Sequence, residues 1–119
     1  MEVFRNFRFH AARHLPKLND KHICKKMHGH TFNLTVHVES KINPDTGFVI
    51  DFFDIDKIFN KEIMPLIDHK NLNTVIGLEN PTSENLCVWI WTKLIKHIPT
   101  ISKLNLSEDH GTGIIYNGK

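Results

Sequence analysis

The sequence is poor in the features that mark secreted and membrane proteins. It contains two cysteines among 119 residues, which is too few for a disulfide framework, so we expect free thiols and a reducing compartment. No apolar run is long enough to span a bilayer, and the first residues lack the pattern of a signal peptide. These absences predict a cytoplasmic protein that has no membrane partner.

A strong charge of either sign is also absent. The formal net charge at pH 7 is +2, which is too small to indicate nucleic acid as a partner. Lysines nevertheless gather before a histidine-rich segment, where they form either a solvated loop or a contact for an anionic group: Lys17, Lys21, Lys25 and Lys26. The chain is long enough for one hydrophobic core but not for two, so we interpret residues 1–119 as a single domain.

Histidine, in contrast, is abundant, with nine in the chain. Cys24, His28 and His30 occur close together, and in an extended strand the two histidines point to the same face. Two imidazoles at the rim of an apolar face suit Zn²⁺, which takes nitrogen ligands in tetrahedral geometry. A catalytic zinc site needs a third protein ligand, and the candidates are His10, His14, His22, His69 and His110.

Hydrophobic periodicity predicts an α+β fold with an antiparallel sheet. A first helix begins at Asp51 or Asp54 and ends near Met64, because Pro65 removes a backbone donor, and residues 66–73 after it are either non-helical or a fraying turn. A second helix begins after the cap Thr82 and ends before Pro99. Alternating residues predict strands over 3–12, 31–40, 48–50, 104–108 and 114–116.

Several motifs occur in a fixed order along the chain, and together they resemble one known family. They are Phe9-His10-Ala11-Ala12, Leu15-Pro16, Cys24 followed by His28-Gly29-His30, Gly47-Phe48-Val49-Ile50-Asp51-Phe52, Leu66-Ile67-Asp68-His69 with Leu72-Asn73, Asn80-Pro81-Thr82-Ser83-Glu84-Asn85, and Glu108 with Tyr116. The chain resembles the 6-pyruvoyltetrahydropterin synthase superfamily nearly end to end. The three residues between Cys24 and His28 are similar to the bacterial branch of 6-carboxytetrahydropterin synthases of the queuosine pathway.

The resemblance implies a tunnelling fold. In this fold a four-stranded antiparallel sheet carries two helices on one face and assembles with copies of itself into a barrel. Trimers pair into hexamers, and the active site lies between subunits. The expected partners are therefore a small-molecule pterin triphosphate and further copies of the chain.

The resemblance also implies a reaction, the zinc-dependent conversion of 7,8-dihydroneopterin triphosphate to 6-carboxy-5,6,7,8-tetrahydropterin with loss of acetaldehyde and triphosphate. Cys24 would be the thiolate base, and Asp68 with His69 would be its partners from a neighbouring subunit. Zinc on His28 and His30 would polarise oxygens of the substrate side chain. Glu108 would bind the amino-pyrimidine edge of the pterin, with Thr82 and Ser83 near the ring.

One position departs from the family pattern. The family usually has a histidine, the third zinc ligand, where this chain has Arg13. His14 follows one residue later, but a regular strand turns it to the opposite face, and only a bulge would bring it back. His22, in the loop before Cys24, is the alternative third ligand, and if neither histidine reaches the metal then zinc is weakly held.

Two other functions stay open at this point. One is a 6-pyruvoyltetrahydropterin-forming lyase on the same fold. The other is a non-enzymatic zinc-binding module, in which Cys24 joins the histidines in a closed site of four protein ligands. An open metal position beside a free Cys24 thiol would indicate catalysis, whereas a bound Cys24 would indicate the module.

Overall fold

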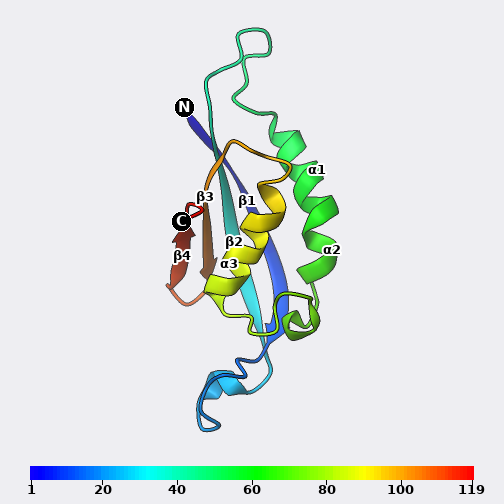
Figure 1. Cartoon of the computed structure of the whole chain (residues 1–119), viewed down its shortest axis with the longest axis vertical. Helices are drawn as coiled ribbons and strands as arrows, with labels where there is room; N and C mark the ends of the chain where they lie inside the picture. Colours follow the sequence, from blue (N-terminus) through cyan, green and yellow to red (C-terminus); the bar gives the residue numbers. More distant parts are fainter.

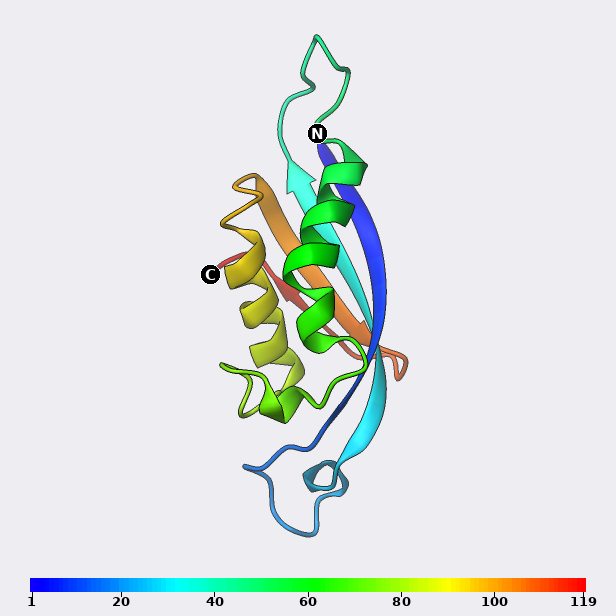
Figure 2. The same ribbon diagram turned by 90° about the vertical axis from the view of Figure 1, so that its right-hand side faces the viewer.

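The computed structural model describes residues 1–119 as a four-stranded antiparallel sheet with helices on one face (Figures 1 and 2). The strands lie in the order β1 (Glu2–Arg13), β2 (His28–Glu39), β3 (Ile101–Glu108) and β4 (Gly113–Tyr116). Each strand pairs with the next one in the chain, so β1 and β4 are the two edge strands. The predicted α+β class and antiparallel sheet are confirmed.

Alternation along the strands sets which side chains enter the core. The inner face of β2 carries Phe32, Leu34, Val36 and Val38, all almost fully buried, while the residues between them face outward, as the period of two requires. Phe9 of β1 packs against Phe32, with ring centroids 5.0 Å apart. The predicted continuation of the histidine face into the core of the sheet is therefore confirmed.

Two long helices cover this inner face. Helix α1 (Phe52–Glu62) begins at Asp51, whose side chain accepts a hydrogen bond from the Phe53 amide, and it buries Ile55 and Phe59. Helix α3 (Ser83–Leu94) lies beside it against the sheet (Figure 2) and buries residues of its inward side: Leu86, Cys87, Ile90 and Leu94. Neither helix is long and apolar enough to cross a membrane.

One predicted element was wrong. Residues 48–50 are not a strand: they lie in the connection between β2 and α1, and they pair with no strand of the sheet. A turn precedes them, in which the Gly47 amide donates to the Asn43 carbonyl at 2.7 Å. Helical structure also resumes after α1 as α2 (Met64–Ile67), because Pro65 occupies its first turn, where a missing amide donor costs nothing.

The two long connections extend past opposite ends of the sheet (Figure 1). The segment between β1 and β2 contains the short 3₁₀ turn η1 (Ile23–Lys25), and the segment between β2 and α1 lies at the other end near the N-terminus. The molecule is accordingly elongated, 57 × 24 × 22 Å. Strand β2 begins at His28, earlier than predicted, so both histidines belong to the sheet and are held by its register.

Candidate active site

The pairing of β1 with β2 positions the two histidines. In the register of these strands His30 lies opposite Ala11 and His28 lies opposite Arg13, without a bulge. The two imidazole rings are 4.3 Å apart between centroids and inclined by 60°. His28 Nδ1 lies 2.7 Å from the Lys26 carbonyl oxygen, which leaves its Nε2 free of partners within the chain. The predicted same-face pair is present.

These histidines line a cavity of about 530 Å³ at the end of the sheet. Its walls come from β1, η1, β2 and the end of β3: Arg13, Ile23, Cys24, Lys26, His28, Gly29, His30, Glu108 and His110. Cys24 lies in η1, which begins at His22 because the His22 Nδ1 accepts a hydrogen bond from the Cys24 amide at 3.1 Å. The fold thus brings together a thiol, two imidazoles and a carboxylate that the sequence singled out.

A buried ion pair lies in the wall of this cavity. The Arg13 guanidinium contacts Glu108 through Nη2, and only 7% of the Arg13 side chain and 14% of the Glu108 side chain are exposed. His30 Nδ1 lies 3.3 Å from the same carboxylate oxygen, Oε1. Burial lowers the pKa of His30, and the Arg13 charge lowers it further, so the imidazole is neutral at pH 7.

The role of Arg13 was not predicted from the sequence, although one signal was available. Arg13 has the same parity as Phe9 and Ala11, so it continues the inner face of β1 into the site. A charged side chain at such a position must find a partner, and Glu108 is that partner. Burial lowers the pKa of Arg13 while Glu108 raises it, and the guanidinium remains charged at neutral pH.

The structure does not bring a third histidine onto the pair. The backbone of His14 is held on both sides by the Asn73 side chain, and His14 does not line the cavity. The His22 ring nitrogen is engaged in capping η1. His110 lines the cavity, but its ring centroid is 6.3 Å from that of His30, and no three ligand-type side chains meet as a metal site.

The donor set therefore does not fit a retained zinc ion as the residues stand. Two imidazoles, His28 and His30, lie side by side, but the strand position facing them holds the Arg13 guanidinium, which has no lone pair to give. The nearest carboxylate, Glu108, is already neutralised by that guanidinium. Positive charge at this point is supplied by the chain itself.

Asp68 and His69 form a second, separate pair. His69 Nδ1 lies 2.9 Å from Asp68 Oδ2, and the His10 amide donates to Asp68 Oδ1 at 3.1 Å. Burial acts to raise the pKa of Asp68, but the hydrogen bonds from His10 and His69 outweigh it and leave that pKa lowered. His69 lines a second cavity of about 360 Å³, which shares Gly29 and His30 with the histidine cavity but not Cys24, so this chain alone does not bring His69 to Cys24.

Ser83 and Thr82 differ in position. Ser83 Oγ lies 3.2 Å from Arg13 Nη1, and Ser83 lines a small cavity of about 220 Å³ that Glu108 also lines. The Thr82 side chain instead caps α3, because its hydroxyl accepts a hydrogen bond from the Asn85 amide at 3.1 Å. Ser83 therefore lies beside Glu108 at the candidate site, whereas the Thr82 side chain is the N-cap of α3.

We predict that Thr82→Ala lowers the free energy of unfolding by about 1 kcal/mol, the usual cost of losing an N-cap side chain. The matched control is Thr82→Ser, which keeps the capping oxygen and should stay within about 0.5 kcal/mol of the wild type. Urea denaturation measures both. If Thr82→Ala leaves stability unchanged and instead weakens pterin binding, the hydroxyl acts at the site and not as a cap.

The two cysteines should differ in reactivity. Cys24 is partly exposed in the cavity wall, whereas Cys87 is fully buried in α3, and burial raises the pKa of its thiol to about 11. We expect iodoacetamide at pH 8 to modify Cys24 in the folded protein and to spare Cys87, since only accessible thiolate reacts. Peptide mass spectrometry identifies the modified residue. Equal labelling of both cysteines would mean that α3 opens in solution.

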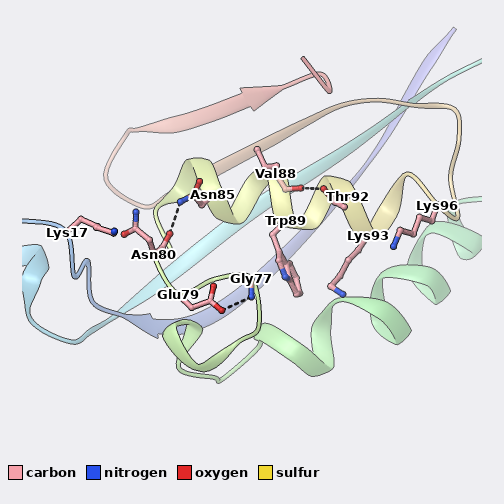
Figure 3. A pocket seen from close by; sticks show the side chains of 10 residues that line it. All are labelled: Lys17, Gly77, Glu79, Asn80, Asn85, Val88, Trp89, Thr92, Lys93 and Lys96. Atoms are coloured by element: carbon pink, nitrogen blue, oxygen red, sulfur yellow. Dashed lines mark hydrogen bonds between the residues drawn. The ribbon is translucent and has the colours of Figure 1, made fainter.

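A groove along α3 is a further hollow, with a volume of about 580 Å³ (Figure 3). It is lined by Lys17, Gly77, Glu79, Asn80, Asn85, Val88, Trp89, Thr92, Lys93 and Lys96. Two of its charged groups contact neighbours: Lys93 Nζ lies 4.8 Å from the centre of the Trp89 ring, and Glu79 accepts a hydrogen bond from the Gly77 amide. None of the predicted site residues lines it, so the histidine cavity is the candidate active site.

Comparison with known proteins gives a consistent result. The sequence profile of the 6-pyruvoyl tetrahydropterin synthase family matches residues 2–119. A 6-carboxy-5,6,7,8-tetrahydropterin synthase from Synechocystis sp. is 36% identical over 96 residues, which cover 77% of this chain and 73% of that protein. A dihydroneopterin monophosphate aldolase from Pyrococcus furiosus is 35% identical over 106 residues, which cover 87% and 86%.

A solved structure agrees in fold. The 6-pyruvoyl tetrahydropterin synthase of Caenorhabditis elegans superimposes with a TM-score of 0.89 over 100% of this chain and 96% of that one, at 24% sequence identity. The predicted arrangement of a four-stranded sheet with two helices on one face is therefore confirmed.

Proposed function

The chain belongs to the 6-pyruvoyl tetrahydropterin synthase family, and we propose that within it the protein acts as a 6-carboxytetrahydropterin synthase in 7-deazapurine (queuosine) biosynthesis. The proposed reaction converts 7,8-dihydroneopterin triphosphate to 6-carboxy-5,6,7,8-tetrahydropterin with loss of acetaldehyde and triphosphate. Two relatives with that name support it, from Synechocystis and, as a putative enzyme, from Archaeoglobus fulgidus. The observation that carries the proposal is the cavity that Cys24, His28, His30 and Glu108 line together.

Cys24 is the proposed base. Its thiol lies in the wall of the cavity and is not committed to the core or to a disulfide. Removal of a proton from the substrate side chain needs such a group within hydrogen-bonding reach. His28 and His30 face the same space, where they can exchange protons with the side-chain oxygens, and the neutral state of His30 suits it to accept one.

Glu108 is the proposed pterin-binding residue. Its Oε1 takes the ion pair with Arg13 and the contact with His30, while its Oε2 makes no hydrogen bond or ion pair within the chain. Oε2 can therefore accept hydrogen bonds from the amino-pyrimidine edge of a pterin. The small cavity that Glu108 shares with Ser83, Thr112 and Gly113 is the space next to it.

We further propose that the active enzyme is a homo-oligomer, a trimer or a hexamer. The β4 edge and the first part of the β1 edge are unpaired, whereas the end of β1 is bonded to residues 69–71. An open edge is a site for strand pairing with another copy. Assembly edge to edge would let Asp68 and His69 of one subunit approach Cys24 of the next, which a single chain does not achieve. Native mass spectrometry, read as multiples of 13.8 kDa, tests this assembly.

Zinc dependence, which the family resemblance implies, stays a prediction. His28 and His30 are two suitable ligands, and Zn²⁺ bound there would act as a Lewis acid on substrate oxygens. The third position is not filled by His14 or His22 in this structure. The roles proposed above for Cys24 and Glu108 do not depend on a zinc ion that stays bound between turnovers.

A related reaction on the same fold is the second candidate. The 6-pyruvoyl tetrahydrobiopterin synthase of Homo sapiens is 33% identical over 97 residues, and the aldolase of Pyrococcus furiosus is similar over a longer stretch. Two alternative reactions therefore remain. One forms 6-pyruvoyltetrahydropterin, and the other is aldol cleavage of the substrate side chain. A zinc-binding module without activity has less support, because Cys24 and the histidines do not close into a four-ligand site.

Product identification decides among these reactions. The purified protein is incubated with 7,8-dihydroneopterin triphosphate, with and without added zinc, and the pterins are identified by mass. A 6-carboxy product made by the wild type and by Cys87→Ala, but not by Cys24→Ala, supports the proposal. A 6-pyruvoyl product or a shortened alcohol assigns the chain to a sister reaction, and no turnover in any condition contradicts the enzyme function.

A further inference from the structure

The strand position opposite His28 is the natural place for a third imidazole. Residues directly opposite each other in an antiparallel pair have side chains on the same face, with Cβ atoms about 4.5–5.5 Å apart. The register places Arg13 at that position. A histidine there would face the His28–His30 pair, whereas the arginine brings a fixed positive charge to the same point.

Arg13 is held in this place by several contacts from different elements. Its Nη1 donates to the Pro81 carbonyl at 3.0 Å and to Ser83 Oγ at 3.2 Å, and its Nη2 contacts Glu108. Its Cζ lies 5.2 Å from the centre of the Phe32 ring, within the range of a cation–π interaction. Because these contacts come from β2, β3 and the start of α3, the guanidinium is a built part of the site.

Two polar atoms at this point still lack partners. Four buried side-chain nitrogen or oxygen atoms in the chain make no hydrogen bond, and Arg13 Nε and His30 Nε2 are two of them. Both residues line the histidine cavity. An arginine N–H can only donate. With His30 Nδ1–H directed at Glu108, the His30 Nε2 offers a lone pair.

A hydroxyl has the chemistry that both atoms require, because it can accept one hydrogen bond and donate another. Its oxygen accepts from Arg13 Nε–H, and its proton is donated to His30 Nε2. A metal ion would satisfy only the histidine and would be repelled by the guanidinium. We propose that Arg13 and His30 bind a hydroxyl of the substrate side chain directly, and that the guanidinium supplies the positive charge there in place of a retained zinc ion. The identity of the substrate rests on the proposed function, whereas the statement about zinc does not.

Metal content tests the zinc part. The wild type, loaded with zinc and then dialysed, should hold well under one zinc per chain by elemental analysis, because only two imidazoles are offered. Arg13→His should hold about one zinc per chain with an affinity at least about 100-fold higher, because three imidazoles then meet. Arg8→His, on the opposite face of the same strand, is the matched control and should behave as the wild type.

Stoichiometric zinc in the dialysed wild type would overturn this part, whether or not Arg13→His folds. A folded Arg13→His protein that gains no zinc would also overturn it, because position 13 would then not face the histidine pair. Both results are independent of turnover, so a failure of the proposed enzymatic function leaves them interpretable.

Ligand binding tests the hydroxyl part. Neopterin carries side-chain hydroxyls, and 6-methylpterin does not, so their affinities for EDTA-treated protein are compared by pterin fluorescence. We expect the wild type to prefer neopterin at least about 10-fold, since an unmade hydrogen bond leaves buried groups unpaired. Arg13→Lys keeps a cation beside Glu108 but loses Nε–H in that geometry, and it should lose the preference.

An equal preference in Arg13→Lys and wild type would overturn the direct hydroxyl contact, as would a wild type that binds both pterins equally. If the protein binds neither pterin, the proposed pterin function and the proposed substrate hydroxyl are both contradicted. The zinc measurement would still show whether Arg13 stands in place of a third zinc ligand.

Discussion

Replacing Cys24 with alanine is expected to lower kcat about 1000-fold, because loss of a positioned base typically costs 10²- to 10⁴-fold. The fold should be unaffected. Cys24 lies in the short η1 turn and contributes nothing to the buried core, so the free energy of unfolding should stay within about 0.5 kcal/mol of the wild type. Steady-state kinetics and urea denaturation on the same preparation measure the two effects.

Cys87→Ala is the matched control, because it removes the other thiol from a place far from the chemistry. Cys87 is part of the hydrophobic core, so this variant should lose about 1 kcal/mol of stability but keep its kcat. A Cys24→Ala enzyme within about tenfold of the wild-type kcat would remove Cys24 from the role of base. His28 and His30 would then be the next residues to test.

Glu108→Ala is expected to lower the free energy of unfolding by about 3–5 kcal/mol, because it leaves the Arg13 guanidinium buried without its counter-charge. The same change should abolish pterin binding, since Glu108 is the proposed contact for the amino-pyrimidine edge. Urea denaturation gives the stability, and fluorescence titration with neopterin gives the binding. The stability effect follows from the structure alone and does not depend on the proposed reaction.

Two further variants distinguish the contribution of the Arg13–Glu108 ion pair to stability from that of its neighbours. Ser83→Ala removes one neutral hydrogen bond to the guanidinium and should cost only about 1 kcal/mol. Arg13→Met combined with Glu108→Leu removes both charges and should recover most of the stability that Glu108→Ala loses, because buried pairs are often replaced by apolar groups without loss. A cost below about 1 kcal/mol for Glu108→Ala would show that water reaches the pair in solution.

Local pattern was sufficient for much of the fold. The alternation of Phe7, Phe9 and Ala11 predicted β1, and Thr82 was correctly identified as the cap of α3. The error at residues 48–50 has a simple cause, since an apolar pattern suits a strand but a strand also needs a partner, and these residues pair with none. Pro65 was taken as a stop, but a proline also suits a helix start.

The candidate site shows even more clearly which features local sequence predicts and which features the tertiary structure decides. The sequence by itself determined that His28 and His30 share a face and that Cys24 lies close by, because these follow from a period of two and a short spacing. The identity of the group facing them was decided only by tertiary structure. Strand register brings Arg13 opposite His28, and the end of β3 brings Glu108 to Arg13 from 95 residues along the chain. Contacts of that range depend on how strands pair and helices cover them, and no local pattern contains that information.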